Sequence, residues 1–260
     1  MPEIKSLQGV PRRELDMFYV LDTSGSMTGT PIAVLNRAMI ETIDVVKEQA
    51  KSNADANVKI AVLEFSSGCR WMQPHGPEEL EDFYWEDLKA GGMTDIGEAL
   101  KELDVKMSRN AFLNSITGAY LPVIIFMTDG YATDDYKKAL SQISQNKWFS
   151  RATKIGFALG DDPDIAMITE IVGNREAIVR TDDLETFAKM LKFVSVTASM
   201  VCSKSRTTND INNMGGEIIK DVMGNGGFAD PTPTPVPEPD TPSSIIDDMG
   251  SLTWWGDDFN

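Results

Sequence analysis

The sequence predicts an α/β protein with an open, twisted, mostly parallel β-sheet and helices on both faces. Two observations indicate this class. Short apolar runs alternate with amphipathic stretches over residues 12–206, as in chains whose strands and helices alternate. The run PVIIFMT at residues 122–128 is apolar without interruption. Such a run is typical of a central parallel strand that helices cover on both sides.

The individual elements follow from the period of the apolar residues. Runs of strand length predict strands at residues 16–21, 58–65, 122–128, 154–159 and 177–180, with a short antiparallel edge strand at 69–72. Helical spacing in the stretches between them predicts helices at residues 32–50, 96–107, 134–146 and 183–203. Asp95 is expected to cap the second of these helices, and Asp134 and Asp135 to lie in the first turn of the third.

Residues 207–260 differ in composition from the rest of the chain. They contain ten acidic residues and one lysine, a net charge of -9 out of -16 for the whole chain. Six prolines lie in the segment PTPTPVPEPDTP at residues 231–242, which is typical of an extended linker. We therefore expect one domain at 12–206, followed by a disordered, Pro-rich acidic tail at 207–260.

Charge and hydropathy narrow the cellular setting and the partners. A net charge of -16 over 260 residues repels phosphate backbones, so nucleic acid is not an expected partner. The sequence has no apolar run long enough to span a membrane and no apolar leader at its start. Its two cysteines are far apart, and we expect both to be reduced thiols. These features predict a cytoplasmic protein that does not bind membranes.

Hard oxygen atoms gather after the first predicted strand, in the segment FYVLDTSGSM. Asp22, Ser24 and Ser26 alternate along an extended segment, so their side chains point the same way. Thr94 follows a Gly-Gly loop in GGMTDIGEAL, and Asp129 ends the central apolar strand in FMTDG. If the two strands are neighbours, Asp22 and Asp129 lie over the same crevice, at the sheet edge where open α/β sheets bind ligands. Carboxylate and hydroxyl oxygens suit Mg²⁺, with Mn²⁺ or Ca²⁺ as alternatives.

Other interpretations exist for each of these residues taken singly. An aspartate or serine after a strand can cap a loop or a helix, so capping is the alternative to metal binding. The Gly91-Gly92 loop could also cradle a phosphate, although Lys89 is the nearest cation. A metal-dependent hydrolase or phosphatase is the competing functional class. The sequence contains neither GxSxG nor a P-loop lysine motif, and no nearby residue has the pattern of a general base, so we expect no enzyme.

The three segments in this order resemble the metal-ion-dependent adhesion site (MIDAS) of von Willebrand factor type A domains. The resemblance covers residues 12–206 and implies a Rossmann-like sheet. The segments RRELDMFYVLDTSGSMTGTPI, FMTDGYATDDY and FVSVTASMVCSKSR resemble, more narrowly, the TerY-like branch of bacterial tellurite-resistance-associated proteins.

The resemblance implies a role for each candidate ligand. Ser24 and Ser26 would bind the metal directly, and Thr94 directly or through water. Asp22 and Asp129 would bind directly or through water and orient the hydroxyls. One position would stay open for an Asp or Glu carboxylate of a protein partner. The TerY-like branch further implies signalling in a stress response, with a protein kinase and a PPM-class phosphatase.

The end of the predicted tail, SLTWWGDDFN, combines aromatic residues with aspartates. We expect this end to bind a partner or the metal site of its own domain, since exposed aromatic residues supply anchoring area.

Overall fold

The structure is a computed structural model that describes residues 12–53, 55–203 and 213–224. Its strands are β1 (Arg13–Asp22), β2 (Ala56–Ser66), β3 (Gly68–Trp71), β4 (Glu78–Glu79), β5 (Val123–Thr128), β6 (Thr153–Leu159) and β7 (Ile178–Thr181). Its helices are α1 (Thr30–Ser52), α2 (Ile96–Lys106), α3 (Tyr136–Ile143), α4 (Lys147–Arg151), α5 (Ile165–Val172), α6 (Leu184–Cys202) and α7 (Met214–Gly224), with short 3₁₀ turns η1 (Gly25–Met27) and η2 (Arg175–Ala177).

The strands form one mixed sheet in the order β3-β2-β1-β5-β6-β7, and β4 pairs with β2. The neighbouring strands β2, β1, β5, β6 and β7 all run parallel to one another. β3 and β4 both run antiparallel to β2. The predicted parallel sheet with a short antiparallel edge strand is therefore confirmed. Within the described residues, no helix is both long and apolar enough to cross a bilayer.

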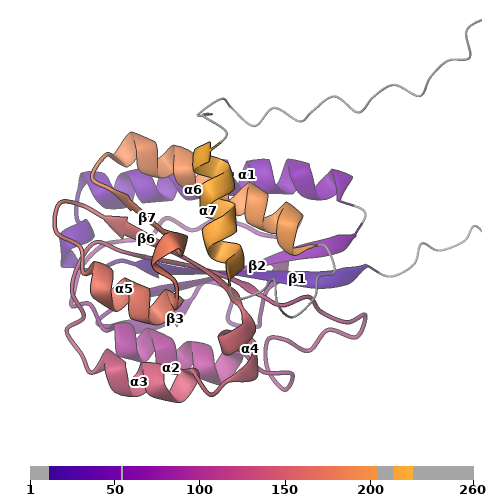
Figure 1. The fold of residues 1–260 in the computed structure, drawn as a ribbon, viewed down its shortest axis with the longest axis horizontal. Helices are drawn as coiled ribbons and strands as arrows, with labels where there is room; N and C mark the ends of the chain where they lie inside the picture. Colours follow the sequence, from indigo (N-terminus) through magenta and orange to yellow (C-terminus); the bar gives the residue numbers. More distant parts are fainter. Residues whose placement is uncertain (1–11, 54, 204–212, 225–260) are drawn as a thin grey trace, which may run out of the picture. The chain divides into compact units, whose positions relative to one another are not determined.

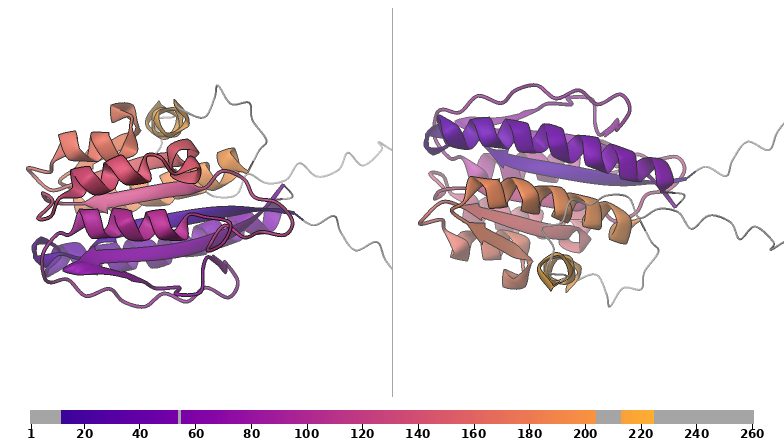
Figure 2. Two further views of the ribbon diagram at one scale, coloured as in Figure 1. Left: turned by 90° about the horizontal axis from the view of Figure 1, so that it is seen from below. Right: turned by 90° about the horizontal axis from the view of Figure 1, so that it is seen from above.

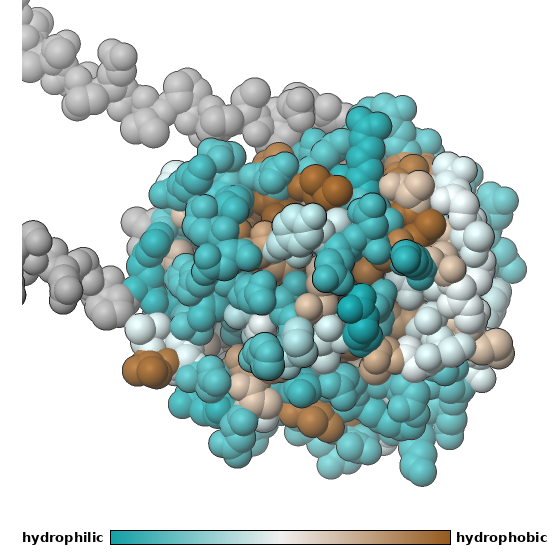
Figure 3. Space-filling model, turned by 180° about the vertical axis from the view of Figure 1, so that it is seen from behind, coloured by the Kyte–Doolittle hydropathy of each residue, from teal (hydrophilic) through white to brown (hydrophobic). Residues whose placement is uncertain are grey.

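Helices cover both faces of the sheet, as the sequence predicts (Figure 1). Side chains of β1 alternate between two cores: Tyr19 and Leu21 belong to the one under α1, α6 and α7, and Phe18 and Val20 to the one under α2, α3 and α5. Figure 2 shows α1 and α6 side by side over the sheet. Figure 3 shows the molecule from behind the view of Figure 1. The surface on this side is mostly hydrophilic, with its apolar residues in separate patches.

The predicted helix at residues 134–146 is wrong in extent, because two helices occupy this region. α3 ends at Ile143 and α4 begins at Lys147. Asn146 separates them: its side-chain oxygen accepts hydrogen bonds from the backbone N–H of Trp148 and Phe149, as an N-cap does. Its amide nitrogen donates to the carbonyl of Met107, which fixes the break against the end of α2.

α7 lies inside the segment assigned to the tail, and the sequence did not predict it. Met214, Ile218 and Ile219 are buried in the core under α1 and α6. A Cβ at Gly215 would lie 2.4 Å from the carbonyl oxygen of Lys154, so the helix backbone approaches β6 at a distance that only glycine allows. The predicted boundary at 206 and the Pro-rich and aromatic segments of the tail lie outside the described residues.

Candidate metal centre

Two neighbouring strands bring the candidate ligands to one edge of the sheet. β1 ends at Asp22 and β5 at Thr128, and the two strands pair in parallel with Leu21 opposite Met127. The carboxyl ends of both strands therefore emerge side by side. The expectation that Asp22 and Asp129 lie over the same crevice depended on β1 and β5 being neighbours. The structure confirms that these two strands pair.

Asp22 is fully buried, and both of its carboxylate oxygens accept hydrogen bonds. The backbone N–H of Ser24 donates to Oδ1 over 2.8 Å, and the hydroxyl of Thr128 donates to Oδ2 over 2.5 Å. Burial raises the pKa of Asp22, the hydrogen bonds from Ser24 and Thr128 lower it, and the charge of Asp129 raises it further. A buried carboxylate under these constraints would be stabilised in its charged form by a nearby cation.

Ser24, Ser26 and Asp129 form a continuous chain of oxygen atoms. The hydroxyl oxygens of Ser24 and Ser26 lie 3.0 Å apart, and the Ser26 hydroxyl donates to Oδ1 of Asp129 over 2.7 Å. Ser24 is buried whereas Ser26 is exposed, so the chain runs from the protein interior to the surface. Oxygens so close together, with two carboxylates and two hydroxyls, form a donor set that a hard divalent cation prefers.

Thr94 joins this group through the backbone of its loop. The N–H of Gly25 donates to the carbonyl of Gly92, and the N–H of Gly91 donates to the carbonyl of Thr23. These bonds hold the loop before Thr94 against the loop that contains both serines. The Thr94 side chain is buried, and no direct hydrogen bond joins it to Ser24 or Ser26. The structure thus brings all three predicted segments to one place.

The loops after β5 and before α2 are bound to each other by residues whose roles the sequence did not reveal. The backbone N–H of Thr94 donates to the hydroxyl of Thr133, and the N–H of Thr133 donates to the carbonyl of Thr94. Asp95 occupies the N-cap position of α2, as predicted, but its carboxylate accepts from the Thr133 hydroxyl and from the N–H of Gly68 rather than from its own helix. Asp95 instead links the hairpin of β2 and β3 to the loop after β5.

Asp134 supplies the cap that Asp95 does not. Its two carboxylate oxygens accept from the N–H groups of Gly97 and Glu98, in the first turn of α2. The predicted place of Asp134 and Asp135 in the first turn of their own helix is wrong, because α3 begins only at Tyr136. Asp135 precedes α3 and accepts from the N–H of Lys138. A sequence contains no local signal for a cap supplied from another segment.

Thr128 is a further residue of the site that sequence reasoning missed. It is buried at the last position of β5, and its hydroxyl fixes the Asp22 carboxylate. The signal was present as a polar residue at the end of PVIIFMT, next to Asp129. In the part of the chain that the structure describes, no group of three or more His, Cys, Asp or Glu residues could hold a metal. Hydroxyl oxygens would therefore make up much of the donor set.

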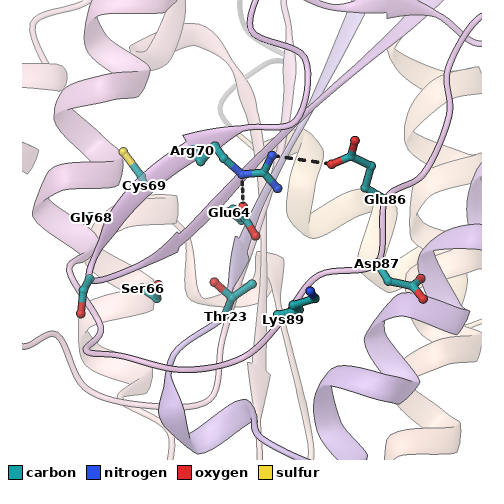
Figure 4. A pocket seen from close by; sticks show the side chains of 10 residues that line it. Thr23, Glu64, Ser66, Gly68, Cys69, Arg70, Glu86, Asp87 and Lys89 are labelled. Carbon is teal, nitrogen blue, oxygen red and sulfur yellow. Dashed lines mark hydrogen bonds and ion pairs between the residues drawn. The ribbon is translucent and has the colours of Figure 1, made fainter.

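A cavity of about 440 Å³ lies beside the candidate ligands. Thr23, between Asp22 and Ser24 in the chain, is part of its lining. Figure 4 shows Arg70 between Glu64 and Glu86. The Nε atom of Arg70 lies 2.5 Å from a carboxylate oxygen of Glu64, and its Nη1 atom 3.6 Å from one of Glu86. The cavity thus presents charged groups of both signs to a molecule bound over the crevice.

Comparison with known proteins gives a family match over part of the chain. Residues 17–132 match the family model described as von Willebrand factor type A domain. This range includes all five candidate ligands.

Solved structures at low sequence identity share the fold. Proximal thread matrix protein 1 of the mussel byssus superposes with a TM-score of 0.55 at 16% identity, covering 73% of this chain and 49% of that one. The same byssus protein is known with a zinc-occupied MIDAS motif, with a TM-score of 0.53 at 17% identity over 73% of this chain and 48% of that one. A von Willebrand factor type A protein from Catenulispora acidiphila gives 0.53 at 18% identity, over 73% and 43%. This chain spans about half the length of these proteins.

Proposed function

We propose that the chain contains a von Willebrand factor type A domain, whose family model matches residues 17–132, and that the protein binds other proteins through a divalent cation. The observation that supports the proposal best is the chain of oxygens from Ser24 through Ser26 to Asp129, which the backbone N–H of Ser24 ties to the carboxylate of Asp22. The chain begins at the buried Ser24 beside that carboxylate and reaches the surface at Ser26, where a cation would be accessible to a partner.

In this proposal the residues of the site have distinct tasks. Ser24, Ser26 and Thr94 would hold the cation through their hydroxyls, and Asp129 would bind it or orient a water on it. The buried carboxylate of Asp22 would balance the charge of the cation, and the hydroxyl of Thr128 would hold that carboxylate in place. The cation would supply a positive charge that attracts a carboxylate. Mg²⁺ fits a donor set of hard oxygens best, although the zinc-occupied MIDAS of the byssus protein makes Zn²⁺ a useful comparison ion.

The partner would present an Asp or Glu side chain to the cation. Because the cation is held by few charged ligands, it would retain a strong preference for an anion. Next to the crevice, the cavity lined by Glu64, Arg70 and Lys89 would contact the residues flanking that acid. This arrangement favours a partner segment with polar or charged neighbours around its carboxylate.

The cellular role proposed here is stress signalling in the bacterial cytoplasm, with a protein kinase and a PPM-class phosphatase as partners. This part is supported by the resemblance of FMTDGYATDDY and the other quoted segments to the TerY-like branch. We propose no catalytic activity, because no residue near the quoted motifs has the pattern of a general base. Hydrolysis of a phosphate ester in Mg²⁺, lost in Ser24→Ala, would instead favour a metal-dependent phosphatase.

Affinity purification with the full chain tests the proposal. Wild type, Ser26→Ala and Ser150→Ala would be compared in Mg²⁺ and in chelator. Ser150 is an exposed serine on α4, so its variant controls for the chemical change alone. We expect a partner retained by wild type and Ser150→Ala in Mg²⁺ only, and lost by Ser26→Ala. Retention that is the same in chelator would refute metal-dependent binding.

A further inference from the structure

A second cavity lies at the other end of the sheet from the candidate metal centre. It has a volume of about 340 Å³, and residues of α4, α5 and α7 line it together with Lys154, the second residue of β6. β6 runs parallel to β5 and β1, whose carboxyl ends lead into the candidate ligands. Because Lys154 lies near the amino end of β6, the length of a strand separates the two places.

Lys154 brings a positive charge to this cavity that the described residues do not balance. It is the only charged residue among the described ones that line the cavity. Its ammonium donates to the carbonyl of Phe149 over 3.0 Å and lies 4.7 Å from the centre of the Phe149 ring. Burial alone lowers the pKa of Lys154 to about 8, with no contribution from a neighbouring carboxylate. A charge buried in this way is costly until an opposite charge pairs with it.

Hydrogen-bond donors accompany this charge. An ammonium has three N–H groups, and the Phe149 carbonyl occupies one of those of Lys154. The Asn174 side chain also lines the cavity, and its Oδ1 is held by the backbone N–H of Glu176. Its Nδ2 donates to Oδ1 of Asn213 over 2.9 Å, which uses one of the two amide N–H groups. The unused donors of Lys154 and Asn174 fit a negatively charged ligand with several acceptor oxygens.

Small residues keep the cavity open. Ala152, Gly173, Ala177 and Gly215 line it, and none of them has a side chain larger than a methyl group. The volume of the cavity is about ten times the share of liquid volume that one water molecule takes. A phosphate group therefore fits with water or a small substituent beside it, whereas a large ligand does not.

We propose that this cavity binds a small oxyanion of the phosphate class through the Lys154 ammonium and the Asn174 amide. The anion balances the charge of the buried lysine, and its oxygens accept hydrogen bonds from the unused donors. The site is separate from the candidate metal centre, and neither depends on the other. The competing explanation is that Lys154 serves only to bond the Phe149 carbonyl in α4, in which case phosphate has no specific effect on the protein.

Calorimetric titration of inorganic phosphate into the full chain tests the proposal, in chelator so that no divalent cation takes part. The proteins are wild type, Lys154→Met and the matched control Lys147→Met, which replaces an exposed lysine on α4. At pH 7 most Lys154 side chains are charged, because their pKa is about 8. We expect one phosphate per chain for wild type and Lys147→Met, and binding at least about tenfold weaker for Lys154→Met. No binding by wild type, or equal binding by all three proteins, would overturn the proposal.

Methyl phosphate, titrated in the same way, distinguishes two sources of such an anion. Binding at least as tight as that of inorganic phosphate assigns the cavity to a phosphorylated small molecule. Weaker binding assigns it to free phosphate, and both results support an oxyanion site.

A further variant covers the case that Lys154→Met does not fold. Lys154→Gln removes the charge and keeps an N–H donor for the Phe149 carbonyl. Phosphate should raise the melting temperature of wild type by mass action and leave that of Lys154→Gln unchanged. An equal rise in both proteins would overturn the proposal.

Discussion

Replacing Asp16 with asparagine should stabilise the protein at neutral and higher pH. Asp16 lies on β1, is only 2% exposed, and sits opposite Lys59 of β2. The Lys59 ammonium is already paired with Glu14 over 3.0 Å and with Glu79 over 3.4 Å. Burial raises the pKa of Asp16 from 3.8 to about 7. The negative charges of Glu14 and Glu79 add to this rise, and the positive charge of Lys59 partly opposes it.

The size of the effect follows from linkage between protonation and folding. Between pH 4 and 7 the folded state binds a proton at Asp16 that the unfolded state has released, so the contribution of Asp16 to stability falls as pH rises. A shift of about three pKa units corresponds to at most about 4 kcal/mol. Asp16→Asn keeps the shape of the side chain and removes its charge. The free energy of unfolding of the variant should therefore exceed that of wild type by up to about 4 kcal/mol at pH 8.

Urea unfolding of wild type, Asp16→Asn and Asp44→Asn at several pH values between 4 and 8 would measure this difference. Asp44 is an exposed aspartate on α1, so its variant reports the effect of the substitution without burial. The free energy of unfolding of Asp16→Asn relative to wild type should rise steadily between pH 4 and 7, and that of Asp44→Asn should stay level. A level or falling difference for Asp16→Asn would refute the reasoning.

Three further substitutions test local features of the structure. Tyr19→Phe should leave the free energy of unfolding unchanged or raise it by up to about 1 kcal/mol, because the buried Tyr19 and Ser195 hydroxyls have no hydrogen-bond partner among the described residues. A fall of more than about 1 kcal/mol in urea unfolding would show that Tyr19 has a partner. Gly25→Ala places a Cβ 3.2 Å from the carbonyl oxygen of Gly92, so the variant should bind Mg²⁺ more weakly than wild type in calorimetry. An unchanged affinity for Mg²⁺ would contradict this expectation. Asp134→Ala removes the cap of α2 and should lower the free energy of unfolding by about 1 kcal/mol, whereas no loss would contradict the cap.

The fold was predictable where the apolar pattern was strong. The run at 122–128 became central strand β5, and the helix predicted at 183–203 became α6, with Asp183 accepting from the N–H groups of its first turn. α5 was not predicted, although Asp164 caps its start and Gly173 ends it with a φ of 82°. α7 was not predicted because the acidic, Pro-rich composition of residues 207–260 indicated a disordered tail. The adjacent glycines at its start also favour a break unless close packing requires them.

The candidate site was predictable to the level of its segments. The alternation of Asp22, Ser24 and Ser26 along an extended segment fixed their common direction. The strand pairing that places Asp129 beside them could only be assumed from the sequence, and the structure supplies it. The bonds of Thr133 to Thr94 and of Asp134 to α2 join segments about 40 residues apart, and no local pattern encodes such contacts.

Calorimetric titration of Mg²⁺ into the full chain tests most directly whether these oxygens bind a cation. Wild type, Ser26→Ala and Ser150→Ala would be titrated under identical conditions. The proposed site predicts one Mg²⁺ bound per chain by wild type and Ser150→Ala, and a loss of that binding in Ser26→Ala, whose hydroxyl lies between Ser24 and Asp129. Equal binding by all three proteins, or binding by none, would contradict a metal centre at this edge of the sheet.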